Sequence, residues 1–131
     1  MTNSIGLITI LVKDYDEAIS FYTHKLGFAL IEDTTISVTK RWVRVSPSAS
    51  AGFCLLLARA ANDRQLSRVG DQTGGRVFLF LYTNDFERDY QTYRDKGVKF
   101  IRQPVKEPYG TVAVFKDLYG NLWDLIEANQ Q

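Results

Sequence analysis

One stretch decides the fold: Ile8-Thr9-Ile10-Leu11-Val12-Lys13-Asp14-Tyr15-Asp16-Glu17-Ala18-Ile19. The unbroken apolar and β-branched run from Ile5 to Val12 predicts a strand buried on both faces. Asp14 follows as a helix cap, because Glu17 stands three residues later in the pattern of a capping box. Apolar side chains then recur at helical spacing, at Tyr15, Ile19, Tyr22 and Leu26, before a helix-ending Gly27. The stretch therefore predicts a strand followed directly by a helix.

The same pattern returns in the second half of the chain. A strand is predicted over 76–83, Asp85 caps a helix and Gly97 ends it. The matching positions are Val12-Lys13-Asp14-Tyr15 with Thr83-Asn84-Asp85-Phe86, and Tyr22 with Tyr93. Further strands are predicted near 28–33, 41–46 and 53–59, and again near 98–102, 111–116 and 121–127. Any two β-α-β segments share some of these features, but their ordered recurrence favours an internal duplication.

The chain is thus interpreted as one domain, 1–131, of two βαβββ modules at about 5–59 and 76–127, joined by a polar linker at 60–75. Its 131 residues carry 16 basic and 15 acidic side chains, so no basic excess indicates a nucleic-acid partner. Cys54 has no partner for an internal disulfide, and the longest apolar run, Val77–Leu81, is too short to span a membrane. We therefore expect a cytoplasmic protein with no membrane or nucleic-acid partner.

Two motifs resemble one known family, the vicinal oxygen chelate superfamily of glyoxalases, bleomycin resistance proteins and dioxygenases. One is the opening stretch with Phe21-Tyr22 and Leu26-Gly27-Phe28. The other is Asp117-Leu118-Tyr119-Gly120-Asn121-Leu122-Trp123-Asp124-Leu125, which is similar to the family pattern D-x-x-G-N-x-x-[ED]-L. The resemblance implies an α+β fold in which a curved, mixed, eight-stranded sheet surrounds a cavity, usually in a homodimer. Some members use a divalent metal for isomerisation or dioxygenation, whereas others hold a drug without metal.

The resemblance also implies where a metal would bind. The family's ligand positions correspond to Leu7, Leu56, Phe78 and Asp124, and only the last of these offers an electron pair. A divalent ion generally needs about three protein ligands. His24, the single histidine, is expected at a solvated helix end. The sequence therefore predicts no metal and no other cofactor.

Side-chain alternation along the strands predicts the lining of the cavity. The residues expected to face inward are Leu7, Thr9, Leu11, Cys54, Leu56, Phe78, Phe80, Tyr82, Leu122, Asp124 and Ile126. Trp42 and Arg41 are added as candidate ligand contacts at the rim, although Trp42 is equally suited to a dimer interface. The loop 106–110 resembles one that closes over the cavity in the family and would present Glu107 and Tyr109. The alternative is that these residues fill a closed core. Asp124 argues against this alternative, because a carboxylate on an apolar wall needs either a path to solvent or a partner such as Arg41, Arg44 or Arg76.

The leading hypothesis is a metal-free protein that binds a small, largely apolar or aromatic molecule, in a sequestration or resistance role. A net charge of +1 argues against a bulky cationic ligand. The rival hypothesis is a glyoxalase-type lyase or isomerase, or a dioxygenase-like enzyme, with Asp124 as base or remnant ligand and Tyr82 or Tyr109 as acid. A third possibility is a closed domain whose dimer surface carries the function.

Overall fold

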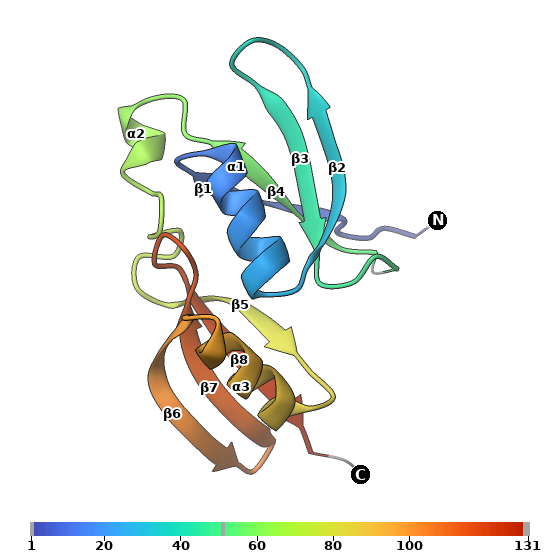
Figure 1. Ribbon diagram of the computed structural model, residues 1–131, viewed down its shortest axis with the longest axis vertical. Coiled ribbons are helices and arrows are strands. Elements are labelled where there is room, and N and C mark those ends of the chain that lie inside the picture. Colours follow the sequence, from blue (N-terminus) through green and yellow to red (C-terminus); the bar gives the residue numbers. More distant parts are fainter. Residues whose placement is uncertain (1, 51, 130–131) are drawn as a thin grey trace. The chain divides into compact units, whose positions relative to one another are not determined.

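The computed structural model describes residues 2–50 and 52–129, which form two compact units, Met1–Val69 and Gly70–Gln131. Each unit is described by itself. The first contains β1 (Leu7–Val12), α1 (Tyr15–Ser20), the π-helix η1 (Phe21–Lys25), β2 (Ala29–Thr35), β3 (Arg41–Ser46), β4 (Cys54–Arg59) and the short helix α2 (Asp63–Leu66). Its sheet has the order β1-β4-β3-β2, with β1 parallel to β4 and the other pairs antiparallel (Figure 1).

The predicted helix cap forms as expected. The Asp14 carboxylate accepts a hydrogen bond from the Glu17 backbone N–H at 2.8 Å, and helix α1 begins at the next residue, Tyr15. The helical segment reaches Leu26, but its last turn is π-helical, with the Leu26 N–H donating to the Phe21 carbonyl five residues back. Gly27 then ends the segment with a φ of 74°.

The expectation that the first strand is buried on both faces is wrong. Ile10 and Val12 are buried, whereas Leu7 and Thr9 on the alternate face of β1 are exposed. Within the first unit, α1 and η1 pack as a single helical layer on one face of the sheet (Figure 1). An apolar run therefore marks a strand here without marking two buried faces.

The second unit repeats the arrangement. It contains β5 (Val77–Tyr82), α3 (Phe86–Asp95), β6 (Lys99–Glu107), β7 (Gly110–Lys116) and β8 (Leu122–Ala128), with the strand order β5-β8-β7-β6. The Asp85 carboxylate caps α3 by accepting from the Arg88 N–H.

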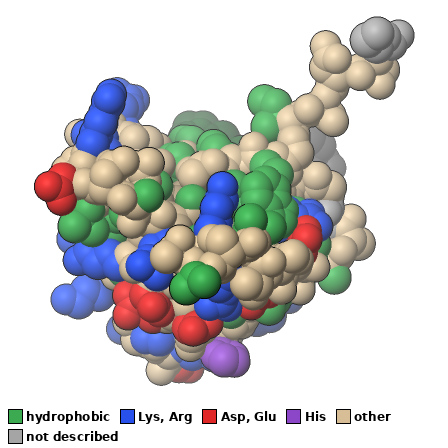
Figure 2. Space-filling view, turned by 90° about the horizontal axis from the view of Figure 1, so that it is seen from above, with side chains coloured by type: hydrophobic (Ala, Val, Ile, Leu, Met, Phe, Trp, Pro, Cys, Tyr) green, Lys and Arg blue, Asp and Glu red, His purple; other side chains and the backbone are tan. Residues whose placement is uncertain are grey.

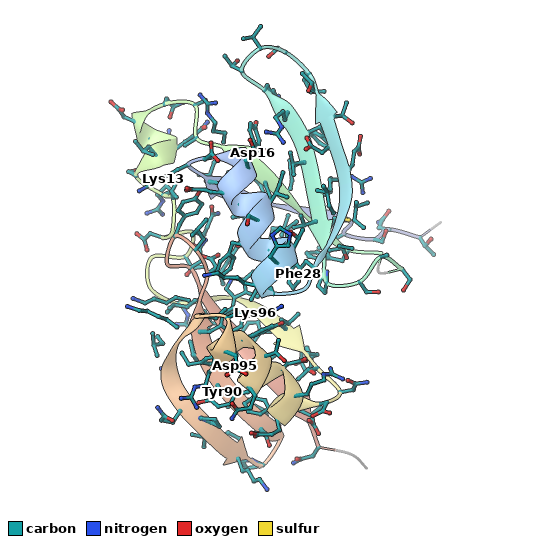
Figure 3. The ribbon with its side chains drawn as sticks, in the orientation of Figure 1. Lys13, Asp16, Phe28, Tyr90, Asp95 and Lys96 are labelled. Carbon is teal, nitrogen blue, oxygen red and sulfur yellow. The ribbon has the colours of Figure 1, made fainter. Side chains whose placement is uncertain are left out.

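Aromatic packing holds α3 on this sheet. The predicted helical stripe of Phe86, Tyr90 and Tyr93 is buried. Tyr90 meets Phe100 edge-on, with ring centroids 4.6 Å apart, and Figure 3 labels Tyr90 on the helix. Tyr93 meets Phe115 in the same way at 5.6 Å.

Strand β6 is longer than predicted. The expected strand near 98–102 continues to Glu107, so the expected loop 106–110 shrinks to a tight turn at Pro108 and Tyr109. Pro104 lies inside this strand, at a shift of register between Arg102 and Val105. Because β6 is the edge strand of its sheet, the missing N–H of Pro104 breaks no ladder between two partners.

The predicted fold class is confirmed: the described residues form an α+β structure, with eight strands in two four-stranded mixed sheets and a βαβββ order in each half. Within the linker predicted at 60–75, Asp63–Leu66 form a single helical turn. No helix among the described residues has the length and apolarity needed to cross a membrane. Figure 2 shows hydrophobic, basic and acidic side chains interspersed on the face in view.

Candidate functional site

Each sheet has one face covered by its helix and one face that the helix does not cover, which we call its open face. On the first sheet the pairing of Thr9 with Leu56 and of Leu11 with Ala58 places these residues on the open face together with Leu7. Trp42 and Arg44 of β3 share it, since Arg44 pairs with Leu56. The covered face carries the buried side chains of Val43, Val45, Leu55 and Leu57. Alternation therefore predicted which side chains of β1 and β4 lie on this face.

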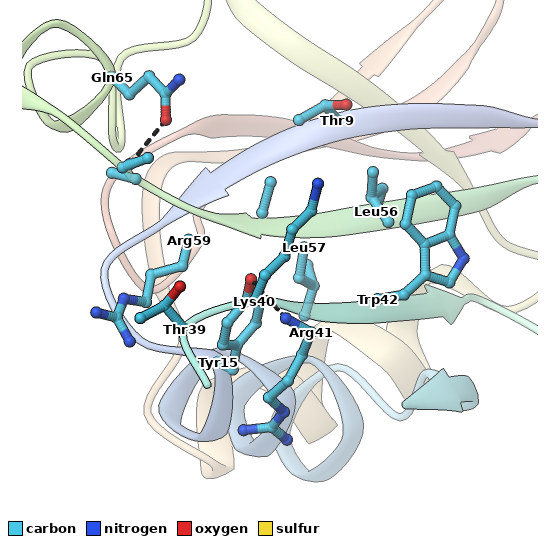
Figure 4. Close-up of a pocket in the computed structure, with 13 residues that line it drawn as sticks. Thr9, Tyr15, Thr39, Lys40, Arg41, Trp42, Leu56, Leu57, Arg59 and Gln65 are labelled. Atoms are coloured by element: carbon cyan, nitrogen blue, oxygen red, sulfur yellow. Dashed lines mark hydrogen bonds between the residues drawn. The ribbon is translucent and has the colours of Figure 1, made fainter. Parts of the chain in front are cut away.

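A pocket of about 580 Å³ lies at one end of the first sheet. The ladder between β3 and β4 runs only from Val43–Leu57 to Val45–Leu55, so the chain segments beyond it separate. The pocket lies along this separation (Figure 4). Its lining residues are Thr9, Tyr15, Thr39, Lys40, Arg41, Trp42, Leu56, Leu57, Ala58, Arg59, Ala60, Ala61 and Gln65.

Tyr15 connects this pocket to the helix below it. Its hydroxyl accepts a hydrogen bond from the Arg41 backbone N–H at 3.2 Å, and the remainder of the side chain is buried. The guanidinium of Arg41 lies over the Tyr15 ring, 5.1 Å from its centroid. The pocket therefore combines apolar and indole surface from the open face with a phenol held in place by the β3 backbone.

Arg41 lines the pocket, but its charge is already neutralised. Its guanidinium donates to both carboxylate oxygens of Asp33, at 3.1 and 2.7 Å, and to Asp16 at 3.0 Å. The hydrogen bonds that Asp33 and then Asp16 accept from Arg41 raise the pKa of the guanidinium, and the same guanidinium lowers the pKa of the Asp33 carboxyl. The predicted ligand contact Arg41 is thus primarily part of an ion-pair network.

Arg44 is paired as well. Its Nε donates to Glu32 at 2.9 Å, and its Nη1 lies 3.5 Å from the Cys54 sulfur. Hydrogen bonds from Thr34 and Arg44 lower the pKa of the Glu32 carboxyl. Arg41 and Arg44 both belong to the first unit, and Asp124 belongs to the second.

The open face of the second sheet carries Asp124. This residue pairs with Phe80 on one side and Val114 on the other, and Tyr82 follows on the same face opposite Ile126. Burial raises the pKa of the Asp124 carboxyl, and the charge of Arg102 opposes that rise. Arg102, on β6 opposite Val114, is therefore the cation that acts on Asp124. Sequence analysis named Arg41, Arg44 and Arg76 for this role and missed Arg102.

A smaller pocket of about 390 Å³ lies on this second open face. Its lining residues are Gly75, Arg76, Val77, Phe80, Ile101, Arg102, Val114 and Leu122. Phe80 is thus a predicted residue that lines a pocket, while Tyr82 is on the same face and 68% exposed.

The remaining predicted residues take different positions. Leu7 is on the first open face, opposite Cys54 and outside the pocket lining. Phe78 is half-buried at an irregularity of β5, where the register passes from Val77 directly to Leu79. Glu107 pairs with Gly110 at the end of the β6–β7 hairpin, and Tyr109 is exposed in its turn. Neither hairpin residue lines a pocket described above.

These positions do not fit a divalent metal. Leu7 and Leu56 in the first unit have no donor atom, and neither has Phe78 in the second. The positive charge of Arg102 acts on the Asp124 carboxylate and would compete with a metal ion for it. Across residues 2–50 and 52–129, no three side chains of His, Cys, Asp or Glu gather as a metal site would require. His24 is exposed on η1, with its Nδ1 3.3 Å from the Ser20 hydroxyl.

The glycine-containing motif at 117–121 has a structural role. One oxygen of the buried Asp117 carboxylate accepts from the backbone N–H groups of Tyr119, Gly120 and Asn121, and the other from the side chains of Asn121 and Trp123. Asn121 in turn accepts from the Gln72 N–H. The motif therefore shapes the turn before β8 and positions the strand that carries Asp124.

Sequence analysis missed Lys40, Arg59 and Gln65 of the larger pocket. They lie where the strands end, so alternation along a strand does not place them. The sequence indicates Lys40 and Arg59 only as basic residues at the ends of two predicted strands, and it gives no such indication for Gln65.

Comparison with known proteins gives a consistent result. Residues 4–125 match the family model described as Glyoxalase/Bleomycin resistance protein/Dioxygenase superfamily. The chain is 57% identical to an uncharacterized protein of Shewanella frigidimarina, over 100% of this chain and 98% of that protein. Among solved structures it is similar to UcmS2, with a TM-score of 0.84 at 31% identity over 96% of this chain and 98% of that one. It is also similar to TnmS3, an antibiotic binding protein from Streptomyces sp. CB03234, with a TM-score of 0.81 at 27% identity over 98% of each chain.

Proposed function

The chain belongs to the Glyoxalase/Bleomycin resistance protein/Dioxygenase superfamily, and from this premise we propose that it binds a small, largely aromatic molecule without a metal. The supporting observation is the pocket of about 580 Å³ on the first sheet, which is lined by Trp42, Leu56 and Ala58. A concave, mostly apolar pocket with a few polar groups is how small-molecule sites are usually built. The similarity to TnmS3, which is described as an antibiotic binding protein, supports sequestration as the role.

The test uses 2-naphthamide, a neutral planar aromatic probe. Binding is measured by calorimetry and by the rise in melting temperature that mass action produces when a ligand binds the folded state. Trp42→Ala removes the largest aromatic surface of the pocket and is expected to weaken binding about tenfold, which corresponds to about 1.4 kcal/mol. Ile36→Ala changes an exposed apolar residue outside the pocket and serves as the control. Wild-type protein that shows neither heat nor thermal shift with this probe would contradict the proposal.

The same protein tests the metal prediction. Zinc, nickel, manganese and iron(II) are each expected to leave the melting temperature unchanged, because the family's metal positions supply only one donor side chain. A stoichiometric metal that persists through dialysis and is released by Asp124→Ala would overturn this prediction.

A second candidate function is a lyase or isomerase centred on Asp124. The observation that favours it is the raised pKa of this carboxyl, since a perturbed pKa is typical of catalytic acids and bases. An enzyme would return a changed molecule, whereas a binding protein returns the ligand intact. Mass spectrometry of a bound natural ligand after prolonged incubation separates the two, and Asp124→Asn would stop turnover only in the enzyme.

A further inference from the structure

The larger pocket has an unbalanced charge. Of its lining residues, Lys40, Arg41 and Arg59 are basic, and none is acidic. Arg41 is already paired with two carboxylates, those of Asp16 and Asp33, as described above. In the part of the chain that the structure describes, Lys40 and Arg59 have no ion pair and no side-chain hydrogen bond. Two positive charges are therefore available to a molecule in this pocket.

The two cations come from separate strands. Lys40 directly precedes β3, and Arg59 ends β4, on the two segments that separate beyond Val43 and Leu57. Figure 4 shows the Lys40 side chain extending toward the side of the pocket where Thr9 and Leu56 lie, and Arg59 near Thr39. Trp42 is two residues beyond Lys40, so indole surface and positive charge occur in one pocket.

We infer that the ligand of this pocket is a planar aromatic molecule that carries an anionic group, such as an aryl carboxylate. This inference rests on the proposed function and names its ligand class. Trp42 and Leu56 contact the ring, and Lys40 and Arg59 attract the anionic group. Hydrogen bonds to a charged partner are stronger than those between neutral groups, and a guanidinium suits a carboxylate particularly well. The overall charge of +1 did not reveal this local excess.

The experiment compares three probes with the same ring system: 2-naphthoate, neutral 2-naphthamide, and 2-naphthylmethylamine, which is protonated at neutral pH. Calorimetry is expected to show 2-naphthoate binding about tenfold more tightly than 2-naphthamide, with the cationic probe weakest. The preference should shrink as the salt concentration rises from about 0.01 M to about 0.5 M, because the side chains of Lys40 and Arg59 are exposed. The affinity for 2-naphthamide should not depend on salt.

Variants assign the preference to the two residues. Lys40→Gln and Arg59→Gln are each expected to reduce 2-naphthoate affinity about threefold to tenfold, and to reduce 2-naphthamide affinity by a smaller factor. Lys40→Arg retains the charge and should retain the preference. Arg64→Gln, which removes an exposed cation of α2 outside the pocket, is the matched control.

The outcomes separate the inference from the function on which it rests. Equal affinities for 2-naphthoate and 2-naphthamide, both lost in Trp42→Ala, would overturn the anionic preference and keep the aromatic-binding function. Tighter binding of the cationic probe would also overturn the preference. Absence of binding by all three probes would overturn the proposed function at this pocket and the inference with it.

Discussion

Asp124 shows how two local effects compete at one residue. Burial on the open face of the second sheet raises the pKa of its carboxyl above the ordinary value of 3.8, and Arg102 opposes the rise. Because the folded-state pKa is raised, the protonated carboxyl favours folding. This contribution is fully present below the unfolded-state value and is lost as the pH rises through the folded-state value. The Asp124→Asn substitution removes the charged form of this side chain. Its effect on the free energy of unfolding is therefore more favourable at pH 7, where the natural carboxyl is charged, than at pH 3, where it is protonated.

The effect of Arg102 on the pKa of Asp124 can be tested by substitution. Arg102→Gln removes the nearby positive charge and is expected to raise the pKa of the Asp124 carboxyl further, since burial then acts without opposition. Carbon-detected NMR titration of the Asp124 carboxyl measures the effect. Arg76→Gln is the matched control, because Arg76 lines the same pocket and does not contribute to this pKa. An unchanged titration in Arg102→Gln, or equal changes in both variants, would contradict the pairing.

Alternation along regular strands predicts the face on which a side chain lies. Trp42 and Leu56, two residues that the sequence proposes as ligand contacts, both line the larger pocket. Arg102 was missed because its position opposite Val114 depends on the register of β6 on β7, and that register shifts twice. Lys40 and Arg59 were missed because the separation of β3 from β4 leaves no mark in the alternation of side chains.

At the scale of elements, caps and glycines gave the most dependable boundaries. Asp14 and Asp85 cap their helices, and Gly27 and Gly97 follow their ends with positive φ. These signals succeed because a cap is a contact between residues close in sequence. The strand predicted near 98–102 is present but ends too early in the prediction, because Pro104 is unfavourable in a strand and only the sheet order shows that β6 lies at an edge.

The segment before β5 packs against the turn that precedes β8, and Gly70 is the point of contact. Gly70 has a φ of 78°, and a Cβ atom placed on it would overlap the backbone carbonyl of Tyr119. The Asp117 carboxylate holds that turn through three backbone N–H groups, so the carbonyl has little freedom to move. Both the backbone conformation and the space at this position therefore require glycine.

Substitution separates these two requirements. Gly74 also has a positive φ, 71°, but open space surrounds the position of its Cβ. Gly74→Ala is expected to cost about 1–2 kcal/mol from the left-handed backbone alone. Gly70→Ala is expected to lower the free energy of unfolding by a further 1–3 kcal/mol or so, from the overlap. Urea unfolding measures both, and equal losses would show that the turn at Tyr119 yields to the extra atom.

At the scale of the whole molecule, the duplication accounts for two open faces with different chemistry. Thr9 pairs with Leu56 in the first unit as Phe80 pairs with Asp124 in the second, so the two halves share a register. The same register positions therefore carry a threonine and a leucine in one half and a phenylalanine and a carboxylate in the other. The same βαβββ order thus presents a pocket with Trp42 in the first half, and in the second half a half-buried Asp124 whose pKa is influenced by the charge of Arg102.

We predict that the protein forms a homodimer, because apolar side chains on these faces are exposed. Leu7 is 38% exposed, Phe80 58% and Tyr82 68%, and each such side chain costs free energy when it faces water. Association that covers these three side chains removes that cost, so light scattering at tens of micromolar is expected to give twice the chain mass of 15.0 kDa. Phe80→Asp places a charge on the open face and should shift the protein toward monomer. Tyr109→Asp, at the exposed hairpin turn, should not. A wild-type protein that remains monomeric at these concentrations would contradict the prediction, and a dimer equally unaffected by both variants would show that a different surface forms the interface.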